Sequence, residues 1–316
     1  LSHVPDSFLK KCGIQKNIMH LVTSEQQNEL LLALDKEKIF VDITPGGSGA
    51  NSMIGISQLG GSTAFSGKIG RDEHGNLYRS KLESLGVSDC LAEGEGTTGS
   101  SLILVSEDGA RTMNTFLGMS QELVNQDIDP SVIQSSKYLY LTGYLWDTES
   151  QKKAVLNALD EAKKFDIKVA LSLSDPFCVT RHKDDFINLL KGYANMVFCN
   201  QEEAFSLIET EITHKAIEIL SGWTETVALT LGANGALISH QGETFYIDPL
   251  PVRVEDTTGA GDAFAAGFLY GMTHDMNALN SGRIGAAMAA GVISQTGSRY
   301  LGNTQKLIKE KLGIIL

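Results

Sequence analysis

The chain has few cysteines, and none is spaced for a metal site or a disulfide framework. Four are scattered over its 316 residues without a CxxC pair: Cys12, Cys90, Cys178 and Cys199. Zinc sites need closely spaced ligands, and disulfide frameworks need a denser set of paired cysteines. The sequence therefore favours reduced thiols, as in a cytoplasmic protein.

Long apolar runs and an excess of basic residues are also missing. No apolar stretch approaches the roughly 20 residues of a membrane span, and no signal segment opens the chain. With 26 Lys and Arg against 38 Asp and Glu, the net charge is -12. Nucleic acids and anionic membranes attract basic surfaces, so we expect neither as a partner. The sequence also lacks an H-x-x-x-H pair and a G-x-S-x-G elbow, which leaves metal hydrolases and serine hydrolases without support.

The most informative run that is present is DTTGAGDAF, residues 256–264. Small residues at Gly259, Ala260 and Gly261 allow a ligand to approach the backbone, and the first N–H groups of a following helix attract anions. Asp262 in that position is suited to accept a proton from an attacking hydroxyl while the amides stabilise a phosphoryl group. The alternative is an ordinary capped helix start. The complete run favours phosphoryl transfer.

This run resembles the C-terminal signature of the ribokinase-like, or PfkB, carbohydrate and nucleoside kinases. A second stretch, GGSGAN at residues 46–51 followed by Gly60-Gly61 and by GRDEHG at 70–75, resembles the N-terminal signature of that family. The resemblance extends from about Asn17 to near the end of the chain. It implies an acceptor site that includes Gly46, Gly47, Ser48 and Asn51.

The coarse pattern predicts an α/β fold with a doubly wound, mostly parallel sheet. Apolar runs alternate with helical patterns from Lys137 onward, which is typical of βαβ units. We expect strands at 138–141, 167–173, 196–199, 227–231 and 236–238, and helices near 149–164, 184–190, 259–270, 281–294 and 304–312. The chain is expected to form a single domain, 1–316, with lid strands inserted at about 15–22, 38–45 and 98–117. Asp108-Gly109 marks a hairpin turn in the last of these segments. The resemblance implies that this small β-sheet covers the acceptor site.

The nucleotide side is predicted from several short motifs. Asn200 and Glu203 form a capping box after a strand, and the resemblance implies that they also organise ATP and Mg²⁺, with Glu203 acting through water. It further assigns nucleotide contacts to Thr230, Gly232, Gly235, Thr257 and Ala289. A hairpin turn at 230–235 and tight helix packing at 284–291 are the alternatives. A requirement for a monovalent cation stays open, and so does the choice between monomer and homodimer.

Within the family, the chain most resembles the adenosine kinases, which implies a role in purine salvage. Met113 and Leu117 match apolar lid positions over the base, and Phe177 matches a position beside the purine. Arg111 either approaches the γ-phosphate or lies exposed on the hairpin. Residues 142–146 add aromatic surface after a core strand. Each of these has an alternative as core packing, and the alternative functions are a PfkB sugar kinase and a non-catalytic metabolite-binding protein.

Two features limit the match. The family has an aspartate that grips two acceptor hydroxyls, and nothing in residues 1–16 corresponds to it; Asp6 lies in a helix-like stretch instead. GSTAFSGK at 61–68 superficially suggests a Walker A loop, but its spacing is one residue too long and Ile69 replaces the required hydroxyl. We interpret it as a strand with Lys68 exposed.

Overall fold

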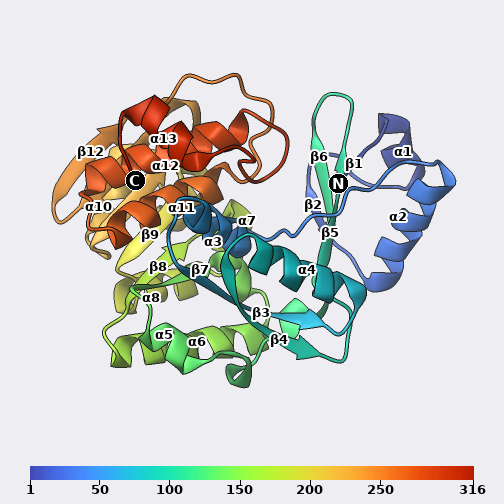
Figure 1. Cartoon of the computed structure of the whole chain (residues 1–316), viewed down its shortest axis with the longest axis horizontal. Coiled ribbons are helices and arrows are strands. Elements are labelled where there is room, and N and C mark those ends of the chain that lie inside the picture. Colours follow the sequence, from blue (N-terminus) through green and yellow to red (C-terminus); the bar gives the residue numbers. More distant parts are fainter.

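The largest sheet of the computed structural model, which describes residues 1–316, has six strands in the order β12-β11-β10-β9-β8-β7 (Figure 1). Its strands β7 to β10 are parallel, while β11 and β12 form an antiparallel hairpin at one edge. The bounds are β7 Tyr138–Thr142, β8 Lys168–Ser172, β9 Met196–Asn200, β10 Thr226–Thr230, β11 Ala236–His240 and β12 Glu243–Ile247. The predicted βαβ alternation is confirmed.

Helices cover both faces of this sheet. Alternate strand residues belong to opposite cores: Val169 and Leu171 pack with one cluster of buried side chains, whereas Ala170 packs with the other. The first core contains residues of α6 Glu149–Lys164, α7 Pro176–Arg181, α8 Lys183–Gly192, α9 Gln201–Ile208 and α10 Thr213–Ser221. The second contains residues of α3 Ser48–Gln58, α11 Ala260–Thr273, α12 Ala278–Ile293 and α13 Thr304–Leu312.

A separate two-stranded parallel sheet lies beside β7 without pairing with it. It consists of β3 Thr63–Gly70 and β4 Val87–Gly94, joined by α4 Glu73–Ser84. Helix α3 reaches both sheets, because a Cβ at Gly49 would lie 3.2 Å from Phe65 of β3 and 3.8 Å from Thr142 of β7. Side chains of β3 and β7 therefore both pack against the first turn of α3.

The lid is a four-stranded sheet in the order β1-β5-β6-β2 that stands beside the main body (Figure 1). Its elements are β1 Ser2–His3, α1 Asp6–Lys11, β2 Met19–Leu21, α2 Ser24–Lys36, β5 Ser100–Val105 and β6 Arg111–Phe116. One face packs on α1 and α2 through buried Phe8, Leu34 and Leu104. Because side chains alternate along a strand, the opposite face carries Met113 and Thr115 toward the main body.

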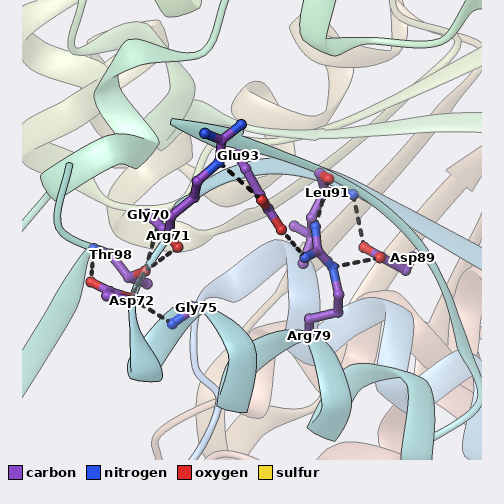
Figure 2. A network of polar contacts seen from close by, with 9 residues as sticks. All are labelled: Gly70, Arg71, Asp72, Gly75, Arg79, Asp89, Leu91, Glu93 and Thr98. Carbon is purple, nitrogen blue, oxygen red and sulfur yellow. Dashed lines mark hydrogen bonds and ion pairs between the residues drawn. The ribbon is translucent and has the colours of Figure 1, made fainter. Parts of the chain in front are cut away.

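A polar network holds the base of the lid against α4 (Figure 2). Asp72 caps α4 by accepting the N–H of Gly75 at 2.7 Å, and it also accepts the N–H and the hydroxyl of Thr98 at 2.8 and 2.6 Å. Arg79 pairs with Asp89 and Glu93 on β4. Thr98 lies two residues before β5, so these hydrogen bonds fix the point at which the chain enters the β5–β6 hairpin of the lid.

Two sequence predictions in this half are wrong. Residues 38–45 contain no strand: Ile39 and Val41 contact the lid core, but the connection pairs with the chain beside β1 only through the two main-chain hydrogen bonds between Asp42 and Leu1, at 2.9 and 2.7 Å. Lys68 lies on the predicted strand, but its side chain is only 13% exposed and its Nζ binds Asp127 at 2.9 Å. The 3₁₀ segments at 118–122 and 125–127 supply Glu122 and Asp127, whose oxygens bind the Lys68 Nζ.

The remaining short elements connect these layers. They are the 3₁₀ segments η1 Gly118–Glu122, η2 Asn125–Asp127, η3 Gly143–Trp146 and η4 Gly232–Asn234, and the helix α5 Pro130–Gln134. No helix of the chain combines the length and apolar character needed to span a membrane.

Candidate active site

The turn before α11 presents unpaired main-chain donors. Gly259 has φ +78°, and a Cβ there would lie 2.2 Å from the carbonyl oxygen of Ser298, so this position requires glycine. Helix α11 begins at Ala260, and the N–H groups of Gly261 and Asp262 have no hydrogen-bond acceptor in the protein. Unpaired N–H groups at a helix N-terminus attract an anion. The turn therefore has the form of a phosphate cradle.

The Asp262 carboxylate lies at this cradle and is held by α3. Its Oδ1 accepts the hydroxyl of Ser48 at 2.5 Å, and its Oδ2 accepts the side-chain amide of Asn51 at 3.0 Å. Burial raises the pKa of Asp262 above its usual value, and the two hydrogen bonds partly offset that rise. A carboxylate with a raised pKa is a stronger base.

Close packing of α3 against α11 sets this geometry. A Cβ at Gly55 would lie 2.7 Å from the Cβ of Ala266, so the two helices touch at small residues. Ser52 donates to the carbonyl oxygens of Ser48 and Asp262 at 3.2 and 3.3 Å, which ties the starts of both helices together.

Most predicted site residues line one cavity of about 1970 Å³ between the lid and the main body. Thr142, Ser172, Asn200 and Thr230 bring the carboxyl ends of β7 to β10 to its wall, as expected for a parallel sheet. The predicted residues on the wall are Gly46, Gly47, Ser48, Asn51, Arg111, Met113, Leu117, Asn200, Glu203, Thr230, Gly232, Thr257, Gly259, Ala260, Gly261 and Asp262.

Three predicted residues do not line this cavity. Phe177 follows the first residue of α7 and its side chain points to solvent, 76% exposed, while Tyr144 and Ser174 line the wall nearby. A Cβ at Gly235 would lie 2.1 Å from the carbonyl oxygen of Ile247, so this glycine serves the β10–β11 turn. Ala289 lies within α12, half-buried by its neighbours.

The glycines of the second predicted signature serve two purposes. Gly46 and Gly47 line the cavity, and Gly47 has φ +100° at the start of α3. Gly70 and Gly75 instead serve packing at the base of the lid, since added Cβ atoms would lie 2.0 and 2.2 Å from carbonyl oxygens.

Arg111 connects the lid to the cradle. Its guanidinium binds the side chains of Asp256 and Thr258, and it is only 17% exposed, so the exposed alternative is wrong. Asp256 also accepts the N–H groups of Thr258 at 2.9 Å and Gly297 at 2.7 Å. The lid in this structure is therefore fastened to the residues that precede the cradle.

Glu203 is a buried carboxylate without a basic partner. It completes the predicted capping box, in which Asn200 Oδ1 accepts the N–H of Glu203 at 2.8 Å and Glu203 accepts the N–H of Asn200 at 3.0 Å. Burial raises the pKa of Glu203 to about 7. No group of three or more His, Cys, Asp or Glu side chains forms a metal cage. A cation coordinated mostly by water and phosphate would nevertheless fit beside Glu203, because Mg²⁺ needs few protein ligands.

Sequence reasoning missed two contributors and left one role unassigned. Ser298 donates to Asn51 Oδ1 at 3.3 Å, and Tyr140 of β7 lies beside Ser52 at 3.4 Å. Neither residue belongs to a motif shared with its contact partner, so the sequence pattern alone could not identify these contacts. Asp6 lies on α1 in the lid and pairs with Lys16 at 2.9 Å, which agrees with leaving the acceptor-gripping aspartate unassigned.

Comparison with known proteins identifies the family. The model of the pfkB family of carbohydrate kinases matches residues 11–305. The chain belongs to the PfkB carbohydrate kinase family.

An uncharacterized sugar kinase from Archaeoglobus fulgidus is 30% identical over 78% of this chain and 97% of its own length. A 5-dehydro-2-deoxygluconokinase from Shouchella clausii is 30% identical over 80% of this chain and 81% of its own length. The crystal structure of an adenosine kinase from Sinorhizobium meliloti has a TM-score of 0.87 and 34% identity, covering 98% of this chain and 94% of that one. The predicted ribokinase-like fold and the kinase class are thus confirmed, and PfkB relatives of this chain include both sugar and nucleoside kinases.

Proposed function

We propose that this PfkB kinase transfers the γ-phosphoryl group of ATP to the 5′-hydroxyl of a nucleoside, adenosine in particular. The observation that carries the phosphoryl-transfer step is the Asp262 carboxylate beside the unpaired N–H groups of Gly261 and Asp262, all on the cavity wall. Asp262 accepts the proton of the acceptor hydroxyl. The amides of the cradle stabilise charge on the phosphoryl group as it moves.

The acceptor end of the cavity supports a nucleoside. Asn51 binds Asp262, and Gly47 precedes Ser48, which also binds it, so both are suited to the ribose. Met113 and Leu117 of the lid offer apolar contacts to a flat base. Phe65 and Tyr144 add aromatic surface to the same wall. The 34% identity to a structure described as an adenosine kinase agrees with this choice.

The nucleotide end is expected to lie along Asn200, Thr230, Gly232 and Thr257, where the strands β9 and β10 end. Glu203 would hold water of a Mg²⁺ shell, since its carboxylate lines the cavity without a cationic partner. A bound Mg²⁺ neutralises charge on the β- and γ-phosphates. Asn200 orients Glu203 through the capping box.

The names of the curated relatives favour a second candidate, a sugar kinase. Both of those described above are named for sugar or sugar-acid substrates. Such an enzyme would use the same Asp262 and cradle, and would differ only in its contacts with the acceptor.

A panel of acceptors separates the two candidates. ADP formation from Mg²⁺-ATP is measured with adenosine, other nucleosides, ribose, fructose and 5-dehydro-2-deoxygluconate at equal concentrations. The proposal expects the highest kcat/KM with adenosine. A higher value with a sugar replaces the nucleoside assignment, and no ADP with any acceptor, despite calorimetric nucleoside binding, contradicts the kinase activity.

A further inference from the structure

Ser48 places a hydroxyl of the protein where an acceptor hydroxyl would have to lie. Its Oγ donates to Asp262 Oδ1 at 2.5 Å, and a general base takes its proton from a group with which it shares a hydrogen bond. The side chain is half-buried and lines the cavity, so a ligand in the cavity can reach it.

The phosphoryl side of the reaction lies next to the same pair. Asp262 supplies both the carboxylate and one of the unpaired N–H groups of the cradle, and Gly261 supplies another. A phosphoryl group held by these amides is therefore adjacent to the carboxylate and to Ser48. Ser48 is the first residue of α3, so its own helix N-terminus also favours nearby negative charge.

Other hydroxyls near the turn are differently engaged. Ser52 donates to main-chain carbonyl oxygens, Thr258 is bound by Arg111, and Ser298 donates to Asn51. Among the side chains of the protein, only Ser48 donates a hydroxyl to the Asp262 carboxylate.

We propose that Ser48 is an autophosphorylation site, modified by bound ATP when no acceptor occupies the cavity. This inference rests on the proposed kinase function. Ser48 Oγ forms a bond to the γ-phosphorus, the bond from that phosphorus to the β–γ bridging oxygen breaks, the serine proton passes to Asp262, and ADP leaves. An acceptor that gives its own hydroxyl to Asp262 displaces Ser48 and protects it.

The modification would inactivate the chain. Phosphoserine carries a charge of about -1.5 to -2 at pH 7, and at position 48 it would stand against the Asp262 carboxylate on the cavity wall. The negative charge and the size of the phosphate group would then prevent an acceptor hydroxyl from reaching the Asp262 carboxylate. Loss of activity during incubation with ATP alone should therefore follow the appearance of phosphate on Ser48.

The test is incubation of the purified chain with Mg²⁺ and γ-³²P-labelled ATP without acceptor, followed by phosphopeptide mass spectrometry. We expect label on Ser48 at a rate constant independent of protein concentration, because nucleophile and base lie in one chain. Ser48→Ala should remove the label, and Asp262→Asn should slow labelling by about 100-fold or more. Ser84→Ala is the matched control, because Ser84 is an exposed serine at the end of α4 that does not line the cavity, and this variant should label as the unmodified chain does. Unlabelled Ser48, or labelling that survives Asp262→Asn, overturns the inference.

A parallel assay of acceptor turnover in the same preparation separates this inference from the proposed function. A chain that phosphorylates an acceptor but never labels Ser48 contradicts only the inference. A chain that labels Ser48 without turning over any acceptor contradicts the acceptor assignment instead, and an inert chain contradicts both.

Discussion

Two glycines of the cradle should respond in opposite ways to the same added methyl group. Gly259 has φ +78°, and a Cβ there would meet the Ser298 carbonyl oxygen at 2.2 Å. Gly261 has no such restriction, and a Cβ on it would have no atom within 4 Å. Gly259→Ala and Gly261→Ala are therefore a matched pair. The first tests whether the backbone conformation requires glycine, and the second tests whether a ligand must approach the backbone closely.

For Gly259→Ala we expect a loss of stability. A left-handed conformation costs an L-residue about 1–2 kcal/mol, and overpacking adds about 1–3 kcal/mol, so the free energy of unfolding should fall by about 2–5 kcal/mol. Gly261→Ala should leave stability unchanged or raise it by up to about 1 kcal/mol, since alanine favours the helix. Urea unfolding followed by circular dichroism measures both.

For Gly261→Ala the expected loss is in catalysis. Its methyl group would project into the open space where the phosphoryl group must approach the N–H groups of Gly261 and Asp262. A displacement of the reacting atoms by about 1 Å costs about 100-fold in rate, so kcat/KM for ATP should fall by that order. A stable Gly261→Ala variant with unchanged kcat/KM would refute the cradle. A Gly259→Ala variant with unchanged stability would refute the reasoning from its backbone conformation.

Three further predictions concern charged groups of the site. Asp262→Asn should lower kcat by about 10²–10⁴ with ATP binding mostly kept; rapid-mix kinetics and calorimetry test this, and full turnover would exclude Asp262 as the base. Glu203 has a pKa raised from 4.5 to about 7, so the native state binds more protons than the unfolded state between these values and stability should fall as pH rises through them. Glu203→Gln should remove this pH-dependent loss of about 3 kcal/mol in the free energy of unfolding, which urea unfolding without nucleotide measures at pH 4.5 and 8. If the variant loses as much stability between these pH values as the unmodified chain, Glu203 is not the group responsible. Arg111→Ala leaves Asp256, 4% exposed, with main-chain donors only. It should lower stability by about 1–3 kcal/mol and speed amide exchange in β6, and unchanged exchange would show that Arg111 does not fasten the lid.

The parallel sheet was predictable because its strands are buried on both faces. Such strands appear as continuous apolar runs between helical patterns, and β7 to β10 lie within about one residue of the predicted positions. The cradle was predictable for a different reason. Its glycines and Asp262 are adjacent in sequence, so a local pattern carries both the backbone conformation and the chemistry.

The lid shows where sequence patterns stop being informative. Ile39, Val41 and Ile43 alternate as in a strand, but only Ile39 and Val41 pack on the lid core, whereas Ile43 is 56% exposed. The connection pairs with the chain beside β1 only at Asp42 and Leu1, so alternation alone did not predict a ladder. Phe177 shows a second limit. The resemblance of its segment to the adenosine kinases predicted a place beside the purine, but the Phe177 side chain is 76% exposed, because the direction of a side chain at a helix start depends on the packing of that helix.

The catalytic geometry itself depends on contacts that no local pattern contains. Ser48 and Asn51 lie 214 and 211 residues before Asp262 in the chain, yet they bind its two carboxylate oxygens. These hydrogen bonds exist because α3 and α11 touch at Gly55 and Ala266, where larger side chains would separate the helices. The raised pKa of Asp262 also follows from this packing, because burial is its main cause. The strength of the base is therefore a property of a helix interface, and the small residues of that interface belong to the catalytic apparatus as much as the cradle does.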